Sequence, residues 1–132
     1  MGVDHNRLSL LVAVLSKRMG LEMGDQDIFV NVAGGLKVDE PAADLGIVSA
    51  MISSFLDKPL DKRMVVFGEV GLAGEIRGVS QPEIRIKEAK KLGFSTCLIP
   101  KSNMEACSAV KGMQLLGVDA IASLMDVLFQ NI

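Results

Sequence analysis

The side chains that could act as nucleophiles or bases are few, and they do not gather in one stretch of the sequence. His5 is the only histidine, and no second histidine or adjacent nucleophile accompanies it. Catalysis by a Ser-His-Asp or a Cys-His arrangement therefore has little support. Cys97 lies in an apolar run and Cys107 in an expected helix. We predict two reduced, buried thiols, and neither a disulfide framework nor a zinc site.

Four carboxylates near two expected helix starts form a second candidate site. They are Asp39, Glu40, Asp44 and Glu83. The simplest interpretation is that the positive end of a helix dipole favours acidic side chains in the first turn. The alternative is a paired-carboxylate acid–base site, which needs two environments that separate the two pKa values. The sequence leaves both interpretations open.

Positive charge is concentrated between Ile76 and Lys91, in a chain whose net charge is −2. The five cations of this stretch are Arg77, Arg85, Lys87, Lys90 and Lys91. Two carboxylates, Glu83 and Glu88, reduce the local charge to +3. One interpretation is a solvated helix face with lysines at the helix end. The other is a surface that contacts the phosphates of DNA without reading its sequence, and a patch of this size would need repeated copies to bind well.

Several motifs of nucleotide-binding and membrane proteins are absent. The sequence contains no GxxxxGK[ST] phosphate loop and no GxGxxG motif, so we do not expect this segment to be an ATPase by itself. Gly68, Gly71 and Gly74 lie in a strand-rich stretch, and we interpret them as turn residues. No apolar run reaches the ~18 residues of a membrane span, and no secretory signal is visible. With the reduced thiols, this predicts a cytoplasmic location and no membrane partner.

The elements that must position these residues alternate between helix and strand. Apolar side chains spaced by three or four residues predict helices, and β-type runs between turn residues predict strands. The expected helices begin at Asp4, Pro41, Pro82, Ser102 and Asp119. The expected strands are residues 27–32, 64–67, 96–99 and 114–118, with a hairpin-like stretch over 68–76. We expect Ser102 to form a capping box with Glu105, and Asp119 to cap the last helix.

This order of elements predicts an α/β domain with a mixed sheet and helices packed on it. A chain of 132 residues that is 49% hydrophobic suits one domain over residues 1–132. Its core must be mostly aliphatic, because there are five Phe and no Trp or Tyr. Met1-Gly2 fits the start of a fragment of a longer protein.

Three segments, in order, resemble the proteolytic domain of the Lon proteases. Residues 38–44 (VDEPAAD) are similar to the Lon segment Asp-Gly-Pro-Ser-Ala-Gly. Residues 68–74 (GEVGLAG) are similar to the hairpin Gly-Glu-Ile-x-Leu-x-Gly, and residues 98–100 (LIP) to a strand end Leu-Ile-Pro. The resemblance implies the Lon-protease-type fold, also described as ribosomal protein S5 domain 2-like, which is an α/β fold with a mixed sheet and packed helices.

Lon proteases use a serine nucleophile and a lysine base, and this sequence departs from both. The resemblance places the serine at Ala42 and, aligned without a gap, the lysine at Glu83. Alanine has no nucleophilic atom, and a glutamate is an anion at neutral pH. A one-turn shift to Lys87 would restore an amine, but Ser49 lies roughly 10 Å too far along a helix to replace the serine. The resemblance therefore implies a segment without catalytic residues.

A finer resemblance, over about residues 4–129, is to the C-terminal domain of the RadA family of bacterial DNA repair proteins. It rests on residues 30–38, 43–45, 67–77 and 112–114. Proteins of this family carry a four-cysteine zinc finger and a RecA-like ATPase ahead of this domain, and they form hexameric rings that act on branched recombination intermediates. The resemblance implies ATP, magnesium and zinc only in upstream domains, a second copy of the chain as partner, and DNA as partner of the whole protein.

Three functional hypotheses follow from these resemblances. The first is a non-proteolytic domain of a RadA-type DNA repair ATPase that helps to assemble the ring and offers a surface to DNA. The second is a Lon-type Ser-Lys peptidase with a rearranged site. The third is a degenerate Lon-like domain attached to another ATPase. Peptidase activity separates the second hypothesis from the others, and the upstream sequence separates the first from the third.

Overall fold

The computed structural model of this chain describes residues 5–19 and 40–129, and it contains helices and strands where the sequence predicts them. The helices are α1 (His5–Met19), α2 (Asp44–Leu56), α3 (Pro82–Lys91), α4 (Met104–Cys107) and α5 (Leu124–Leu128). Short 3-10 turns precede three of them, namely η2 (Pro41–Ala43), η3 (Lys101–Asn103) and η4 (Ile121–Ser123). The strands are β1 (Met64–Val66), β2 (Glu69–Val70), β3 (Ile76–Arg77), β4 (Thr96–Pro100) and β5 (Gln114–Val118). The strand expected at residues 27–32 lies outside the described residues.

The main sheet is parallel, in the order β1-β4-β5. Its strands are joined by crossovers that contain α3 and α4, as parallel pairing requires. The pairing of β1 with β4 extends to Phe67, whose N–H donates to the Leu98 carbonyl at 3.1 Å. The chain then turns away at Gly68, so β2 and β3 pair antiparallel in a separate hairpin. The sequence predicts a mixed sheet. Among the described strands, the three-stranded sheet is parallel and antiparallel pairing occurs in the separate hairpin.

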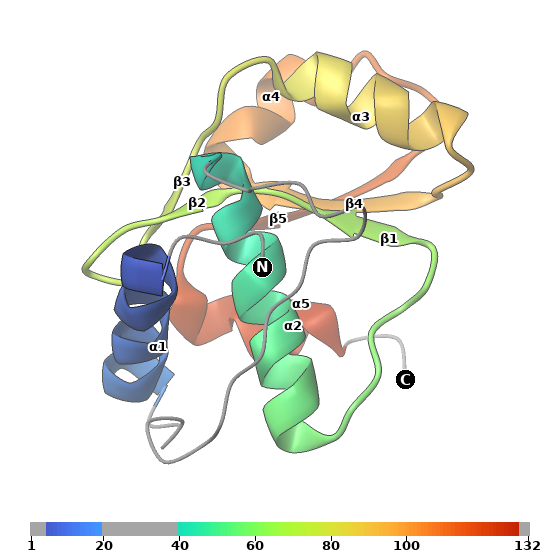
Figure 1. Ribbon diagram of the computed structural model, residues 1–132. Coiled ribbons are helices and arrows are strands. Elements are labelled where there is room, and N and C mark those ends of the chain that lie inside the picture. The colour runs from blue at the N-terminus through green and yellow to red at the C-terminus, as the bar shows by residue number, and fades with distance from the viewer. Residues whose placement is uncertain (1–4, 20–39, 130–132) are drawn as a thin grey trace.

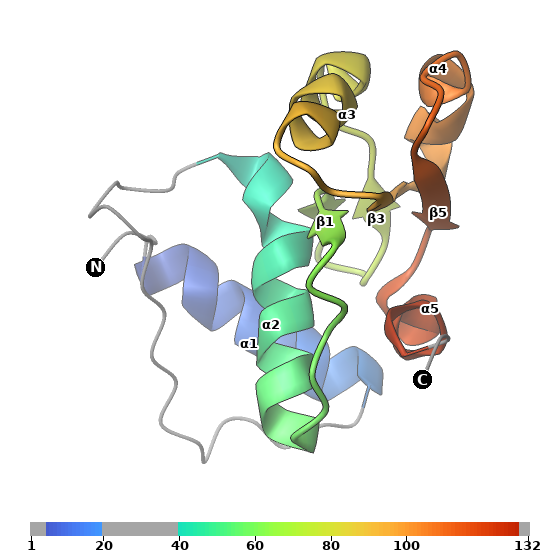
Figure 2. The same ribbon diagram turned by 90° about the vertical axis from the view of Figure 1, so that its right-hand side faces the viewer.

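Helices cover both sides of the parallel sheet. Helices α1, α2 and α5 lie on one side, and α3 and α4 lie on the other (Figures 1 and 2). Successive side chains of a strand point to opposite faces, and β4 follows this rule. Leu98 packs in the core on the α2 side, whereas Cys97 and Ile99 pack in the core on the α3 side. The fold is thus an α/β arrangement with one core on each side of the sheet.

The apolar stripes of the two longest helices face the core on the α2 side, as the sequence predicts. Leu11 and Leu15 of α1 and Leu45, Val48 and Ile52 of α2 are fully buried. Each such side chain contributes about 1.5–3 kcal/mol relative to an exposed one. The small residues on the other faces of α2 permit close packing, and a Cβ atom at Gly46 would lie 3.5 Å from the Val66 carbonyl oxygen of β1.

Two predicted helix caps are wrong. Ser102 lies inside η3, and the residue that precedes α4 is Asn103, whose side chain makes no capping bond. The Asn103 side chain instead accepts the Val79 N–H at 2.9 Å and donates to the Val79 carbonyl at 3.3 Å. Asp119 does not cap the last helix either, because Ala120 is extended and η4 begins at Ile121 without a side-chain cap. In both cases a contact with a distant segment or an extra 3-10 turn replaces the local cap.

Candidate functional site

The three segments that resemble Lon meet at Gly68. The Gly68 N–H donates to the Ala42 carbonyl at 2.9 Å, and the Gly68 carbonyl accepts the Leu45 N–H at 3.0 Å. A Cβ atom at this glycine would lie 3.1–3.3 Å from the side chains of Leu45, Pro100 and Ile76, and its φ is +154°. Only glycine fits such a close approach without strain. The start of α2, the hairpin and the end of β4 therefore form one junction, which contains Ala42.

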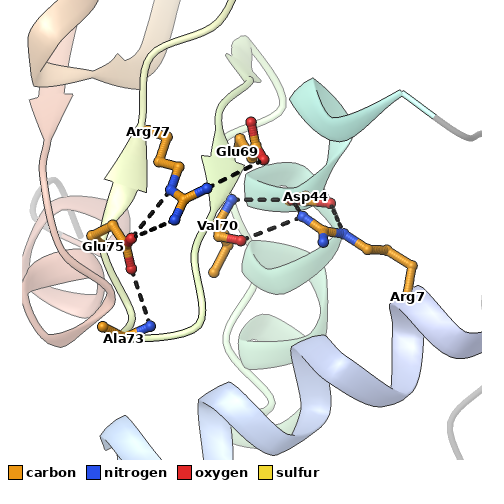
Figure 3. A network of polar contacts seen from close by, with 7 residues as sticks. All are labelled: Arg7, Asp44, Glu69, Val70, Ala73, Glu75 and Arg77. Atoms are coloured by element: carbon orange, nitrogen blue, oxygen red, sulfur yellow. Dashed lines mark hydrogen bonds and ion pairs between the residues drawn. The ribbon is translucent and has the colours of Figure 1, made fainter.

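Asp44 lies at this junction and is buried, with a side chain that is 2% exposed. Its Oδ1 accepts a hydrogen bond from Arg7 Nε at 3.0 Å, and its Oδ2 accepts one from a terminal guanidinium nitrogen of Arg7 and one from the Val70 N–H at 3.1 Å (Figure 3). The Arg7 guanidinium also donates to the Val70 carbonyl at 3.3 Å. The hydrogen bond to Asp44 raises the pKa of Arg7 above its ordinary value, although burial opposes it. Both carboxylate oxygens are engaged, so Asp44 joins α1, α2 and β2 and does not serve as a base.

The hairpin has its own closed polar network. The Glu75 carboxylate accepts the Ala73 N–H at 3.1 Å and two hydrogen bonds from Arg77 at 2.9 and 3.1 Å (Figure 3). The Glu75 backbone N–H and the Arg77 guanidinium lower the pKa of Glu75. The Gly71 N–H donates to the Glu75 carbonyl at 2.9 Å, which confirms the turn predicted for this stretch. Arg77 is thus held within the hairpin by the carboxylate beside it.

No described side chain near Ala42 is placed as a serine nucleophile. Ala42 is buried, with 4% of its surface exposed. Ser49 lies further along the chain in α2 and is fully buried, and its hydroxyl donates to the Leu45 carbonyl at 2.7 Å. A hydroxyl that donates to the carbonyl one turn earlier closes a local bond within its own helix. The side chain of His5 lies outside the described residues.

The side chain of α3 that reaches the start of α2 is Arg85. Its guanidinium donates to Glu40 Oε1 at 2.7 Å and to the Ser80 carbonyl at 2.9 Å, and it lies over the ring of Phe67 at 6.0 Å. Glu83 is exposed, and its charge adds to the effect of burial in raising the pKa of Cys107 in α4. The sequence alone did not identify Arg85 for this contact, because Arg85 and Glu40 are 45 residues apart in the chain.

The carboxylates of this set that the structure describes, Glu40, Asp44 and Glu83, do not bond to one another. Asp39 lies outside the described residues, Asp44 binds Arg7, and Glu40 binds Arg85. Within the described part of the chain, no hydrogen bond joins two of these carboxylates. Asp44 and Glu40, near the start of α2, are thus each paired with an arginine from another element, whereas Glu83 of α3 is exposed.

The five predicted DNA-contacting cations occupy three different places. Arg77 belongs to the hairpin and Arg85 to the contact with Glu40. Lys87 and Lys91 are exposed and one turn apart on α3, and neither takes part in an ion pair with a described residue. Lys90 Nζ donates to the Lys111 carbonyl at 2.6 Å. The structure therefore keeps the three lysines of α3 together and separates the two arginines from them.

Both thiols are buried and unpaired by any disulfide, as predicted. Burial, with a smaller effect of the neighbouring Cys107, raises the pKa of Cys97 to about 11. In the described ranges no group of three or more His, Cys, Asp or Glu side chains is arranged to hold a metal ion. None of the helices in these ranges is both long and apolar enough to cross a membrane.

Comparison with known protein families identifies the group to which this chain is related. Residues 7–103 match the family ChlI, described as subunit ChlI of Mg-chelatase. The chain belongs to the ChlI family. The matched range covers most of the chain and includes α1, the Gly68 junction, the hairpin and β4. The family is described by its Mg-chelatase subunit, so the magnesium chemistry in that description belongs to the chelatase subunit and is not assigned to this chain.

Curated proteins that are similar to this chain include several DNA repair proteins, and the resemblance to RadA is confirmed. The chain is 51% identical to DNA repair protein RadA of Bacillus subtilis over 92% of its own length and 26% of that protein. It is 50% identical to RadA of Escherichia coli over 96% of its length and 27% of the relative. For RadA of Aquifex aeolicus the identity is 50%, over 97% of this chain and 28% of the relative. The chain thus spans about a quarter of the curated relatives it matches.

Proposed function

We propose that this chain is the C-terminal, Lon-like domain of a RadA-type DNA repair and recombination ATPase, where it helps to assemble a ring and offers a surface to DNA. The observation that carries the proposal is the identity of about half its residues, over 92–97% of the chain, with proteins named DNA repair protein RadA. Because the chain spans about a quarter of those relatives, we assign ATP hydrolysis, magnesium and zinc to upstream domains. The buried thiols fit a cytoplasmic protein.

The fold we propose is that of the Lon proteolytic domain, the ribosomal protein S5 domain 2-like fold. Its support is the junction at Gly68, where the three Lon-like segments come together although they are far apart in the sequence. A chance likeness of three short motifs would not by itself bring them into contact. An experimental structure in which residues 27–32 do not form a strand of this fold would contradict the assignment.

The domain is non-proteolytic in this proposal. In support, the residue at the position of the Lon serine is Ala42, and Ser49 is buried and bonded within α2. The position of the Lon lysine is an exposed glutamate, Glu83, and the α3 cation nearest the start of α2 is an arginine engaged by Glu40. A Ser-Lys dyad needs a hydroxyl and a neutral amine within hydrogen-bond reach, and arginine does not lose its proton in proteins.

A peptidase assay tests this part of the proposal. The chain and its Ala42→Ser variant are each incubated with unfolded casein and fluorogenic peptides, beside an active Lon protease. We expect no turnover above the blank for either protein, because a serine without a neighbouring amine stays unactivated. Turnover that survives repurification and is lost on substitution of one residue of this chain would support the rearranged peptidase instead.

The proposed DNA contact uses the exposed lysines of α3. Lys87, Lys90 and Lys91 lie on one helix, and their ammonium groups are not held by any described carboxylate. Aromatic side chains suitable for stacking on bases are scarce, so binding should be directed at phosphates, tolerant of sequence and sensitive to salt. Reversing the charge of all three lysines should weaken binding to duplex DNA and flatten its salt dependence. Unchanged affinity and an unchanged salt slope would contradict the contact.

The scaffold role is tested by sedimentation at high micromolar concentration. A ring-forming protein has head-to-tail surfaces that repeat without being self-complementary, so we expect oligomers or a monomer–oligomer equilibrium. The scaffold role would be contradicted if the chain is strictly monomeric and the longer protein still forms an intact ring without this segment. If the sequence that precedes the segment in its gene lacks a zinc finger and a RecA-type phosphate loop, the alternative of a Lon-like domain on another ATPase would hold.

A further inference from the structure

Three loops that are distant in sequence lie side by side along the edge of the parallel sheet where its strands begin. The Arg63 carbonyl, before β1, accepts the N–H groups of Ser95 and Thr96 at 3.0 and 3.3 Å. The Ser95 carbonyl, before β4, accepts the Gln114 N–H at 2.9 Å at the start of β5. The chain enters β1 and β4 at the right of Figure 1, below the end of α3. These backbone hydrogen bonds fix residues 61–63, 90–95 and 111–114 relative to one another.

The three loops bring together positive charges from separate stretches of the sequence. Their cations are Lys62, Arg63, Lys90, Lys91 and Lys111, which we call the basic rim. All five are exposed. Asp61 is the one carboxylate of these loops, so five cations and one anion give a local charge of +4, in a chain of net charge −2. Asp61 lies 3.8 Å from Arg63, a long contact between two exposed groups that leaves most of the guanidinium free.

Lys90 has a different position from the other members of the rim. Its ammonium group donates to the Lys111 carbonyl at 2.6 Å, and its side chain lies against Gly112, where a Cβ atom would be 3.1 Å from it. Gly112 has a φ of +84°, which favours glycine. Lys90 therefore attaches the 111–113 loop to the end of α3 and sets where the Lys111 side chain begins.

We propose that the basic rim, extending from the end of α3 across the starts of β1 and β5, is the surface that contacts the phosphates of DNA. This inference rests on the proposed DNA contact and deepens it by adding Arg63 and Lys111, which lie outside the charged stretch at residues 76–91. Arg77 and Arg85 do not belong to this surface, because Glu75 and Glu40 neutralise them. Within the rim, Lys90 differs from the other cations because its ammonium group already donates to the Lys111 carbonyl. We therefore refine the contact proposed for the three lysines of α3, and assign to Lys90 the role of positioning Lys111 in place of a direct phosphate contact.

The test measures binding of the 132-residue chain to duplex DNA at several salt concentrations. Arg63→Gln, Lys91→Gln and Lys111→Gln are compared with wild type. Each lost phosphate contact should make the slope of log K against log salt shallower by about 0.9. The matched control is Lys101→Gln, because Lys101 is an exposed lysine at the opposite edge, directly after β4. We expect the control to keep the wild-type slope, and thermal melting to be the same for all four variants.

The outcomes separate this inference from the function on which it rests. If Lys91→Gln weakens binding but Arg63→Gln and Lys111→Gln behave as the control does, the rim is wrong and the contact by α3 stands. If Lys101→Gln weakens binding as much as the rim variants do, binding reflects overall charge and the rim is again wrong. If the wild-type chain does not bind DNA even at the high micromolar concentration at which we expect it to self-associate and so to repeat the patch, both the rim and the proposed DNA contact are overturned.

The role of Lys90 has its own readout in a double-mutant cycle. If Lys90 acts by placing Lys111, Lys90→Met and Lys111→Met should each weaken binding, and the double variant should be no weaker than the more affected single one. Lys90→Arg should retain wild-type binding, because a guanidinium can still donate to the Lys111 carbonyl. Additive losses in the double variant would mean that Lys90 contacts DNA directly, and would overturn its assignment as a positioning residue.

Discussion

The two sides of the parallel sheet use charge in opposite ways. On the α2 side, Asp44 is buried and both of its oxygens bind Arg7 or Val70, so the charge is internal and joins three elements. On the α3 side, the described lysines are exposed and form no ion pair, while the buried ionisable groups are two thiols. The comparison teaches that a buried ion pair on the α2 side holds the fold together, whereas the exposed lysines on the α3 side carry charge that no described carboxylate neutralises and that can act on a partner.

The largest expected effect comes from breaking the internal ion pair. Asp44→Ala leaves the Arg7 guanidinium and the Val70 N–H without their partner, and should lower the free energy of unfolding by about 3–5 kcal/mol. The matched control is Glu40→Ala, which removes the exposed partner of Arg85 and should cost about 0–1 kcal/mol. Urea denaturation measures both. Equal losses in the two variants would contradict the distinction between internal and surface charge.

The junction at Gly68 gives the next largest effect. Gly68→Ala places a methyl group within 3.1–3.3 Å of three side chains and adopts an unfavourable φ, and it should destabilise the protein by roughly 1–3 kcal/mol. Gly46→Ala is the control with the opposite sign. Its methyl would meet only the Val66 carbonyl, at 3.5 Å, and alanine is the better helix former by about 0.5–1 kcal/mol. A Gly68→Ala protein as stable as wild type would mean that the junction is looser than described.

The buried thiols should make the α3 side sensitive to alkaline pH. Burial raises the pKa of Cys97 from 9.0 to about 11, so above pH 9 the thiol ionises in the unfolded chain before it ionises in the folded one. Stability is therefore fully present below pH 9 and is lost as the pH rises towards 11, by up to about 1.4 kcal/mol per pH unit. Denaturation curves across this range should show a shallower loss in Cys97→Ala. An identical pH dependence in the variant would exclude Cys97 as the cause.

The smallest expected effect lies on the outer face of α3. Lys87→Gln and Lys91→Gln remove exposed charges without a described partner, and should change the free energy of unfolding by no more than about 0.5 kcal/mol. Thermal melting of the two variants beside wild type checks this. A loss above about 1 kcal/mol in either would place that lysine among the groups that hold the fold together, and the contrast between the two sides would weaken.

The sequence by itself determined the class of the fold and the order of its elements. Helical spacing of apolar residues placed α1 and α2, and glycines and prolines marked where α3 and the hairpin begin and end. These signals are local, because backbone preferences and apolar periodicity depend on residues a few positions apart. The likeness to RadA and the burial of both thiols were also accessible from sequence, since motifs in order and apolar surroundings are read along the chain.

The tertiary structure alone decided which charges pair. Arg7 and Asp44 are 37 residues apart, and Arg85 and Glu40 are 45 apart, so no local pattern links them. Ser102 and Asp119 do not act as the expected caps, because 3-10 turns form at the starts of those helices and Asn103 bonds to the distant Val79. The basic rim arises in the same way, from three loops that become neighbours only when β1, β4 and β5 pair. Charge interactions depend on distance in space, and that distance is set by how the elements pack.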